Sequence, residues 1–444
     1  KMGGGLMQLV AYGAQDIYLT GNPQITFFKV VYRRHTNFAM ESIEQTFNGN
    51  VALNKRVTAT ISRNGDLIKD MWLECDFSAV TGSVYGLGNA LVKQVEVEIG
   101  GQLIDRQYGE WMNIWSELSV PEGKRVGYDQ MVGNVANTRD TDTDTTNPSS
   151  PGAPTDPGER LDVPLMFWFN RNPGLALPLI ALQYHEVKIN LDIESSDNLS
   201  RGDAAQTVTL RNMKLWVDYI YLDTDERRRF AQVSHEYLIE QVQFTGDESL
   251  SSTSKRVDLS FNHPVKELVW VHQSATQKRG GNGASTLPTE PCKFTSLVNS
   301  TGGSPSTAKL QLNGHDRFTE RRMEYFGRVQ TYKHHTHMPR ADRTLALAAH
   351  VVNNLTDIDT ADLGDDFAEV AFTEDNGQHI YVYSFALNPE EHQPSGTCNF
   401  SRIDNATLQL SNLPSGLNGI LKVFAVNYNV LRVMSGMGGL AYSN

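Results

Sequence analysis

KLWVDYIYLDTDERRRFAQVSHEYLIEQVQF, residues 214–244, decides the fold, because it closes one half of the chain and opens a second half of similar design. Its first part, LWVDYIYLD, is aromatic and β-branched with an alternating pattern, which predicts a β-strand. Its last part, HEYLIEQVQF, predicts another strand. Between them TDERRRFAQ is charged, and Asp223 and Glu226 have the spacing of a helix N-cap and its reciprocal partner. We expect a short charged turn or a single helical turn here, outside the core.

The same landmarks occur in the same order on both sides of this segment. They are an alternating strand that runs into a glycine turn, an aromatic strand broken by Asn-Pro, a second alternating strand and a closing strand. They lie at 95–99, 167–173, 187–191 and 216–221 in the first half, and at 308–312, 384–389, 406–410 and 423–433 in the second. This repetition predicts a duplicated all-β domain.

The length of the chain agrees with a duplication. Its 444 residues suit two domains of about 200 residues, each large enough to bury a core. We place an N-terminal arm at residues 1–25, a first domain at 26–223, a linker at 224–235 and a second domain at 236–444. The first 24 residues show no helical or strand period, which is typical of an arm that becomes ordered when a partner binds it.

Charge and composition exclude several classes of protein. The net charge of −12 argues against a basic surface that coats nucleic acid, so we expect no direct nucleic-acid partner. The longest apolar run, near Leu175, is short and contains Pro178, so no membrane-spanning helix is predicted. The N-terminus lacks a secretory signal, so we expect synthesis in the cytosol. Cys75, Cys292 and Cys398 lie far apart and are expected to be free, buried thiols.

One helix stands out among the strands. Within residues 108–119, Trp111, Ile114, Trp115 and Leu118 recur at helical spacing. We expect a short amphipathic helix over the end of a sheet, with its tryptophans in the core.

Local turn residues and polar composition predict the connections. Asn64-Gly65 predicts a two-residue β-hairpin. Residues 121–160, 273–307 and 333–378 contain long polar segments and are expected to form exposed loops.

Candidate chemistry is sparse. The tract His334-His335-Thr336-His337 is the best metal candidate, because His335 and His337 could lie on one side of a strand. It lacks the glutamate and glycine spacing of a cupin site, so an exposed or interface tract is favoured. Glu96 and Glu98 share a strand face but do not oppose each other across a cleft.

Catalytic motifs are absent as well, since no nucleophile elbow, phosphate loop or His-Glu-x-x-His occurs in the sequence. We expect no catalytic residue, no cofactor and no metal site, and therefore not an enzyme. The candidate N-glycosylation residues are Asn198, Asn299, Asn354, Asn399 and Asn405.

Several blocks of the chain carry a resemblance to a known family. AYGAQDIYLTGNPQITFFKVVYRRHTNFAMESIEQTFNG (11–49), NPGLALPLIALQYHEVKI (172–189) and NYNVLRVMSGMGGLAY (427–442) closely resemble the major capsid proteins of the large icosahedral double-stranded DNA viruses. Further matching blocks lie at 61–70, 216–224, 229–246 and 393–408. The algal-virus branch and its mimivirus-like relatives are the most similar, and the blocks cover nearly the whole chain apart from its loops.

The resemblance implies a double jelly roll, two eight-stranded β-sandwiches side by side, with three chains forming a pseudo-hexagonal capsomer that tiles the virion shell. It implies as partners neighbouring capsomers, minor capsid and penton proteins, and an inner viral membrane beneath the shell. The arm would lie inside, the loops outside with glycans and host-surface contacts, and assembly would take place in host cytoplasm. The chain departs from the family mainly in the three long loops, which leaves external shape and glycan positions open.

Two other classes remain at this point. A jelly-roll carbohydrate-binding protein would need exposed aromatic residues, whereas the six tryptophans lie in patterns that indicate burial. A cupin-like enzyme would need a complete histidine and glutamate metal set.

Overall fold

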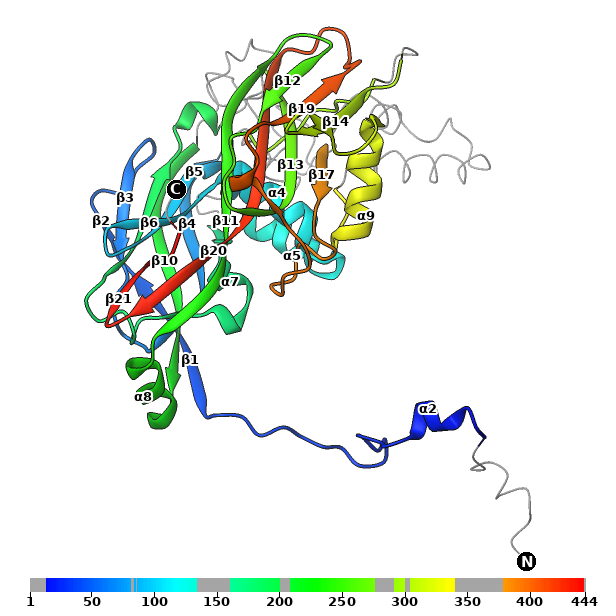
Figure 1. Ribbon diagram of the computed structural model, residues 1–444. Coiled ribbons are helices and arrows are strands. Elements are labelled where there is room, and N and C mark those ends of the chain that lie inside the picture. The colour runs from blue at the N-terminus through cyan, green and yellow to red at the C-terminus, as the bar shows by residue number, and fades with distance from the viewer. Residues whose placement is uncertain are drawn as a thin grey trace, which may run out of the picture. The chain divides into compact units, whose positions relative to one another are not determined.

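The computed structural model describes residues 13–80, 84, 86–133, 160–199, 208–275, 291–299, 304–339 and 378–442. The chain divides into two units, residues 1–37 and residues 38–444. The first unit contains the short helix α2 (Asp16–Thr20), none of whose residues is buried. The second unit holds the described strands (Figure 1).

The first half of the second unit is a sandwich of two antiparallel sheets. The β10 sheet has the strand order β1-β10-β4-β7 with β8 beside β4, and the β9 sheet has the order β2-β3-β9-β5-β6. Its strands are β1 (Phe38–Gln45), β2 (Phe47–Asn48), β3 (Arg56–Thr60), β4 (Leu67–Val80), β5 (Val92–Ile99), β6 (Gln102–Tyr108), β7 (Arg160–Pro164), β8 (Leu177–Pro178), β9 (Val187–Ile193) and β10 (Val208–Leu222). Alternation places Met71, Leu73 and Cys75 of β4 in the core between the sheets.

The second half repeats this plan. The β20 sheet has the order β11-β20-β13-β17, with β18 beside β13 and β21 beside β20, and the β19 sheet has the order β12-β19-β14-β15, with β16 beside β14. Its strands are β11 (His235–Leu250), β12 (Lys255–Asp258), β13 (Pro264–Ser274), β14 (Thr307–Leu312), β15 (His315–Asp316), β16 (Arg321–Arg322), β17 (Ile380–Ser384), β18 (Cys398–Asn399), β19 (Ala406–Ser411), β20 (Gly419–Met434) and β21 (Met437–Leu440).

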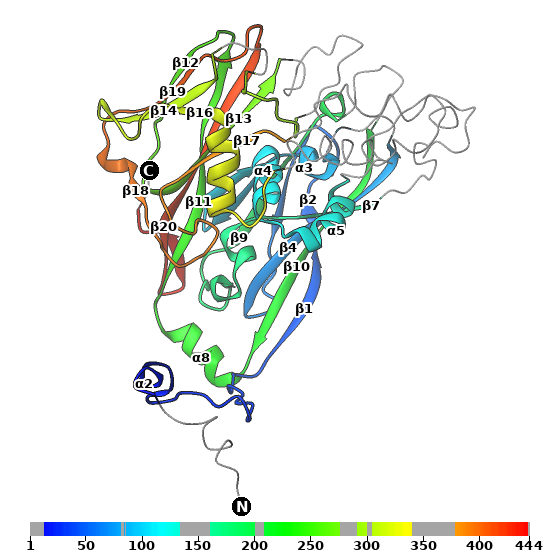
Figure 2. The same ribbon diagram turned by 90° about the vertical axis from the view of Figure 1, so that its right-hand side faces the viewer.

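The strand orders confirm the duplication. In each half, the first, eighth, third and sixth of eight principal strands form one sheet, and the second, seventh, fourth and fifth form the other. The same topology therefore occurs twice, and the predicted all-β double jelly roll is confirmed. Two jelly rolls lie side by side in Figure 2.

Short helices connect the strands. They are α3 (Leu87–Leu91), α4 (Gly109–Ser119), α5 (Glu122–Val132), α7 (Trp168–Arg171), η1 (Pro173–Leu175), η2 (Ser196–Asn198), α8 (Thr224–Gln232), η3 (Tyr325–Val329), α9 (Gln330–His334) and η4 (Phe400–Arg402). None of the helices described is long and apolar enough to cross a membrane. Cys75, Cys292 and Cys398 are free thiols, as predicted, and Cys75 and Cys292 are buried. The expected burial is wrong for Cys398, which is half-buried.

Two predicted glycine turns are present. Gly100 and Gly101 join β5 to β6 with φ of 59° and 85°, and Asn313 and Gly314 join β14 to β15 with φ of 51° and 78°. Positive φ at both central residues matches the right-handed twist of a hairpin, and Asn and Gly accept it at low cost. The strand that runs into a glycine turn is therefore present in both halves of the structure, as the sequence predicted.

The predicted hairpin at Asn64-Gly65 is wrong, because β3 and β4 belong to different sheets. Gly65 is needed for a close approach instead. A Cβ atom there would come within 2.8 Å of the Tyr219 side chain, whose hydroxyl donates to the Ser62 carbonyl oxygen at 2.7 Å. The chain therefore crosses between sheets beneath a core tyrosine.

Two further local predictions need correction. Residues 167–169 do not form a strand, because the Asn170 side chain accepts from the Phe167 amide at 3.1 Å and starts α7, which buries the aromatic rings. The linker forms more than one helical turn, since α8 has 9 residues. Its N-cap is Asp223, whose carboxylate accepts from the Thr224 amide. Local capping outweighs strand propensity in the first case.

Gly109 and Gly127 provide a matched test of the packing at the start of α4. A Cβ at Gly109 would lie 2.1 Å from the Asn89 carbonyl oxygen, whereas nothing lies within 4 Å of a Cβ at Gly127. Gly109→Ala should destabilise the protein by about 1–3 kcal/mol through overpacking. Gly127→Ala should be neutral or stabilise α5 by up to about 1 kcal/mol. Thermal unfolding followed by circular dichroism measures both, and equal midpoints would contradict the packing argument.

Candidate functional site

The helix α4 joins the two jelly rolls (Figures 1 and 2). It follows β6 of the first jelly roll, and Met112 packs in that core. Its remaining large side chains pack on the outer face of the β20 sheet of the second jelly roll: Trp111, Ile114, Trp115 and Leu118. Ten of its 11 residues are buried. The predicted helix and its apolar face are therefore confirmed, and the tryptophans are core residues as expected. The polar side of α4 is buried as well, because a jelly roll lies on either side.

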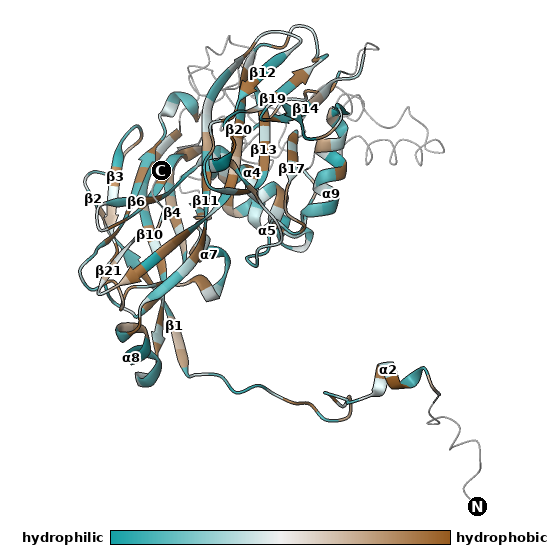
Figure 3. Ribbon diagram, viewed as in Figure 1, coloured by the Kyte–Doolittle hydropathy of each residue, from teal (hydrophilic) through white to brown (hydrophobic). Residues whose placement is uncertain are grey.

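The sheet face beneath α4 is apolar. Phe244, Phe424, Val269 and Val382 form one row across β11, β20, β13 and β17. The rings of Phe244 and Phe424 stack with centroids 4.8 Å apart, and Trp111 lies 5.4 Å from Phe424. Figure 3 shows hydrophobic segments along β20 and β13. Truncating one such buried aromatic side chain typically costs about 3–5 kcal/mol.

A buried ion cluster lies at one end of this contact. Arg171 of the first jelly roll approaches Glu240 of β11 at 2.9 Å, and Glu240 approaches Lys266 of β13 at 2.7 Å. The Arg171 guanidinium also stacks 4.0 Å above the Trp115 ring of α4. Burial lowers the pKa of Lys266, and the carboxylates of Glu240 and Glu267 oppose that shift. The cluster therefore links both jelly rolls and α4 through charge.

The cluster continues to a buried histidine. The His335 ring lies 3.1 Å from Glu267 and 2.8 Å from Glu390, and Glu267 is completely buried. Burial alone would lower the pKa of His335, but the two carboxylates outweigh it and raise this pKa to about 9. Burial would likewise raise the pKa of Glu267, and the His335 charge holds it below its usual range. At neutral pH the site contains an imidazolium between two carboxylates.

The histidine tract is not part of a strand, and only part of it is exposed, since Thr336 is exposed and His334 is half-buried. His335 and His337 follow the end of α9 and are both buried. His337 Nδ1 donates to the Glu117 carbonyl oxygen of α4 at 2.8 Å, and its Nε2 lies 3.0 Å from Glu122. The interface part of the prediction is correct, and its cause is pairing with backbone and carboxylates. Among the described residues no group of three or more metal-ligating side chains is suited to a metal ion.

A second polar contact crosses the junction near β6. The Asp105 carboxylate accepts from the Val242 amide of β11 at 3.2 Å and from the Gln107 side chain at 3.0 Å. Burial raises the pKa of Asp105 to about 6, although these hydrogen bonds and the nearby Arg171 oppose the shift. Perturbed carboxyl groups often mark active sites, but here the partners are structural backbone and amide groups.

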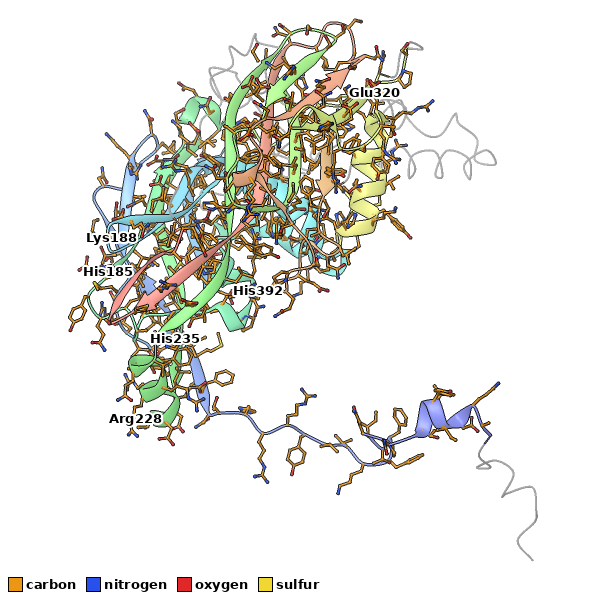
Figure 4. All side chains as sticks on the ribbon, viewed as in Figure 1. His185, Lys188, Arg228, His235, Glu320 and His392 are labelled. Carbon is orange, nitrogen blue, oxygen red and sulfur yellow. The ribbon has the colours of Figure 1, made fainter. Side chains whose placement is uncertain are left out.

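A pocket of about 380 Å³ opens beside the ion cluster. Its lining includes Arg171, Glu240, Glu390 and His392, and Figure 4 labels His392 near α7. Three glutamates and one arginine are among its lining residues. Glu96 and Glu98, the two glutamates that share a strand face, do not line this pocket. Glu96 has a structural role, since it is paired with arginines.

The structure places four of the five predicted glycosylation residues. Asn399 and Asn405 are exposed, whereas Asn198 and Asn299 are half-buried. Asn399 caps η4 by accepting from the Ser401 amide. Asn354 lies outside the described residues.

Sequence reasoning missed the ion cluster and one pair of tryptophans. The signal for the cluster was present, because Lys266-Glu267 directly precedes the apolar run Leu268–Val271 within one strand. The expectation that all six tryptophans are buried is wrong for Trp72 and Trp216, which are half-buried on the outer face of the β10 sheet and stacked with centroids 6.4 Å apart. The alternating pattern of β4 and β10 alone would have placed both tryptophans on the outer face of the sheet.

Comparisons with known proteins agree with this architecture. Residues 26–223 match the family described as "Major capsid protein N-terminus", and residues 226–347 and 373–439 match "Large eukaryotic DNA virus major capsid protein". A major capsid protein of Pyramimonas orientalis virus is 55% identical over 446 residues, and that of Paramecium bursaria Chlorella virus 1 is 42% identical over 489 residues. Each alignment covers 100% of both chains.

Solved structures give the same result. VP54 of Paramecium bursaria Chlorella virus 1 has a TM-score of 0.72 and 37% identity, covering 94% of this chain and 100% of that chain. The Faustovirus major capsid protein has a TM-score of 0.69 at 13% identity, covering 95% and 94%, which supports the fold alone.

The two jelly rolls and the α4 junction between them, together with these structural neighbours, define a double jelly-roll protein of the viral capsid class. The chain belongs to the large eukaryotic DNA virus major capsid proteins, the proteins that form the capsid shell of large double-stranded DNA viruses. Its place is the virion shell, beside other capsid subunits.

The His335 ion pair makes stability depend on pH. The folded-state pKa of about 9 exceeds the ordinary 6.5, so folding favours the protonated ring. Its contribution, roughly 3 kcal/mol, is complete below pH 6.5 and is lost as the pH rises through 9. The thermal unfolding midpoint should therefore decrease as the pH rises from 6.5 to 9. In His335→Gln this fall should shrink while the midpoint at neutral pH is lower; an unchanged pH dependence would exclude His335 as its source.

Proposed function

We propose that three copies of this chain form a capsomer with six jelly rolls and a pseudo-hexagonal outline. The observation that supports it is the duplication itself, because two similar jelly rolls held by α4 turn threefold symmetry into near-sixfold packing. Such capsomers tile an icosahedral shell. The chain acts as a building unit and not as an enzyme.

The same proposal extends to domains and partners. Residues 1–25 form an arm directed to the inside, 26–223 and 236–444 form the two jelly-roll domains, and 224–235 is the linker. The family matches that begin at residue 26 and end at residue 223 support the first two boundaries. Minor capsid and penton proteins are further partners, and an inner membrane lies beneath the shell. Outer loops contact the host, and assembly takes place in host cytoplasm. The acidic net charge supports a shell protein without direct nucleic-acid contact.

Light scattering on the purified chain tests the capsomer directly. The expected mass is three times the chain mass of 49.5 kDa, and it should not change when a chelator is added. A stable monomer would contradict spontaneous capsomer formation, and a mass that depends on metal would favour a cupin-like site instead.

Glycan positions provide a second test of the outer surface. We propose Asn399 and Asn405 as the glycosylated residues among those described, because their side chains are exposed. Peptide mass mapping of protein from virions should find added hexose on one or both. Glycan on the half-buried Asn198 or Asn299 alone would contradict the argument from exposure.

A further inference from the structure

The junction between the two jelly rolls pairs a helix with the outer face of a sheet. Because the fold is duplicated, the chain also has a second helix and a second sheet face at the equivalent places. In the first jelly roll, α4 lies between the fifth and sixth principal strands and covers the β20 sheet of the second. The second jelly roll carries a helix at the equivalent place, η3 followed by α9, before β17. The first jelly roll carries the equivalent sheet face, the outer face of the β10 sheet. We propose that the η3–α9 helix of one copy docks on the outer face of the β10 sheet of a second copy.

The η3–α9 helix is constructed like α4. Met323 and Phe326 are completely buried in the core of their own jelly roll, as Met112 of α4 is in its own. Beyond them, large side chains point outward: Val329 is 39% exposed and Tyr332 is 76% exposed. In α4 the corresponding outward side chains are those that bury on the β20 sheet. An apolar surface without such cover is typical of a protein contact.

The β10 sheet has a matching centre. Glu44, Trp216, Trp72 and Pro164 form one row across β1, β10, β4 and β7, in the same strand order as the phenylalanine and valine row beneath α4. The two indoles stack with an interplanar angle of 12° and are half-buried. Stacked, partly exposed tryptophans surrounded by polar residues are characteristic of the centre of an interface.

Charge agrees with this pairing. Around the tryptophans the sheet face carries more carboxylates than cations. The cations are Lys214 and Arg160, and the carboxylates are those of Glu44, Glu74, Asp76, Asp162 and Asp218. The exposed side of the η3–α9 helix carries Arg328 and Lys333. Opposite charge on two surfaces favours their association and fixes its register.

Such a contact is head-to-tail, since the two surfaces differ. A head-to-tail contact between identical chains forms a closed ring when the rotation per copy allows it. This inference rests on the proposed capsomer, in which three copies close the ring, and it names the surfaces that meet.

The test compares two tyrosines of equal exposure. Tyr332 and Tyr184 are each 76% exposed, so glutamate at either position should leave the fold of one chain intact. Tyr332→Glu should reduce the solution mass from three chains to one, and Tyr184→Glu should keep three. A trimeric Tyr332→Glu protein beside a trimeric wild type would overturn the inference and leave the capsomer intact. A monomeric wild type would overturn both.

Cross-linking tests the pairing without relying on loss of association. In a Cys398→Ser background, a chain with Tyr332→Cys and Glu44→Cys is treated with a short bifunctional maleimide. Dimers and trimers should become covalent in the double variant, and neither single variant should cross-link. Cross-linking of Tyr332→Cys alone would indicate a contact between two helices and would overturn the inference, as would no cross-link in a trimeric double variant.

Discussion

The rest of the structure depends on the burial of α4 between two jelly rolls. The β20 sheet is apolar on both faces, with Trp270 and Val423 directed to its own core and Val269 and Phe424 directed outward. A sheet with two apolar faces needs cover on each, and α4 provides the second. Residues 38–444 accordingly form one unit that contains both jelly rolls.

The two copies of the fold have diverged where their neighbours differ. The β20 row consists of phenylalanine and valine, as suits a contact that forms during folding and stays closed. The β10 row places a glutamate and a proline on either side of two tryptophans, and carboxylates surround them. A face that meets water before it meets a partner needs polar groups for solubility, and interfaces between separately folded chains have this mixed character.

Alternation and turn chemistry predicted much of the fold, because both are local. The strands at 95–99 and 308–312 and their glycine turns needed nothing beyond their own residues. The burial of α4 on all sides could not be read from its sequence, since it depends on a sheet more than a hundred residues away. Gly65 failed as a hairpin signal for the same reason, because Tyr219 determines its surroundings. The tract at 334–337 was expected to be exposed or at an interface, and the burial of His335 could not be predicted because its partners, Glu267 and Glu390, are distant in sequence.

The buried ions have a role that apolar contacts do not supply. Apolar burial is non-directional, so α4 alone would tolerate small rotations of one jelly roll against the other. Ion pairs and hydrogen bonds need particular geometry, and those of Arg171 with Glu240 and of His337 with the α4 carboxyl end join elements of both jelly rolls. Removing charges from water carries a desolvation cost of several kcal/mol per ion, which their mutual attraction offsets only in good geometry. The directional geometry of these contacts therefore restricts how the two jelly rolls lie against each other, which the apolar contact of α4 alone does not.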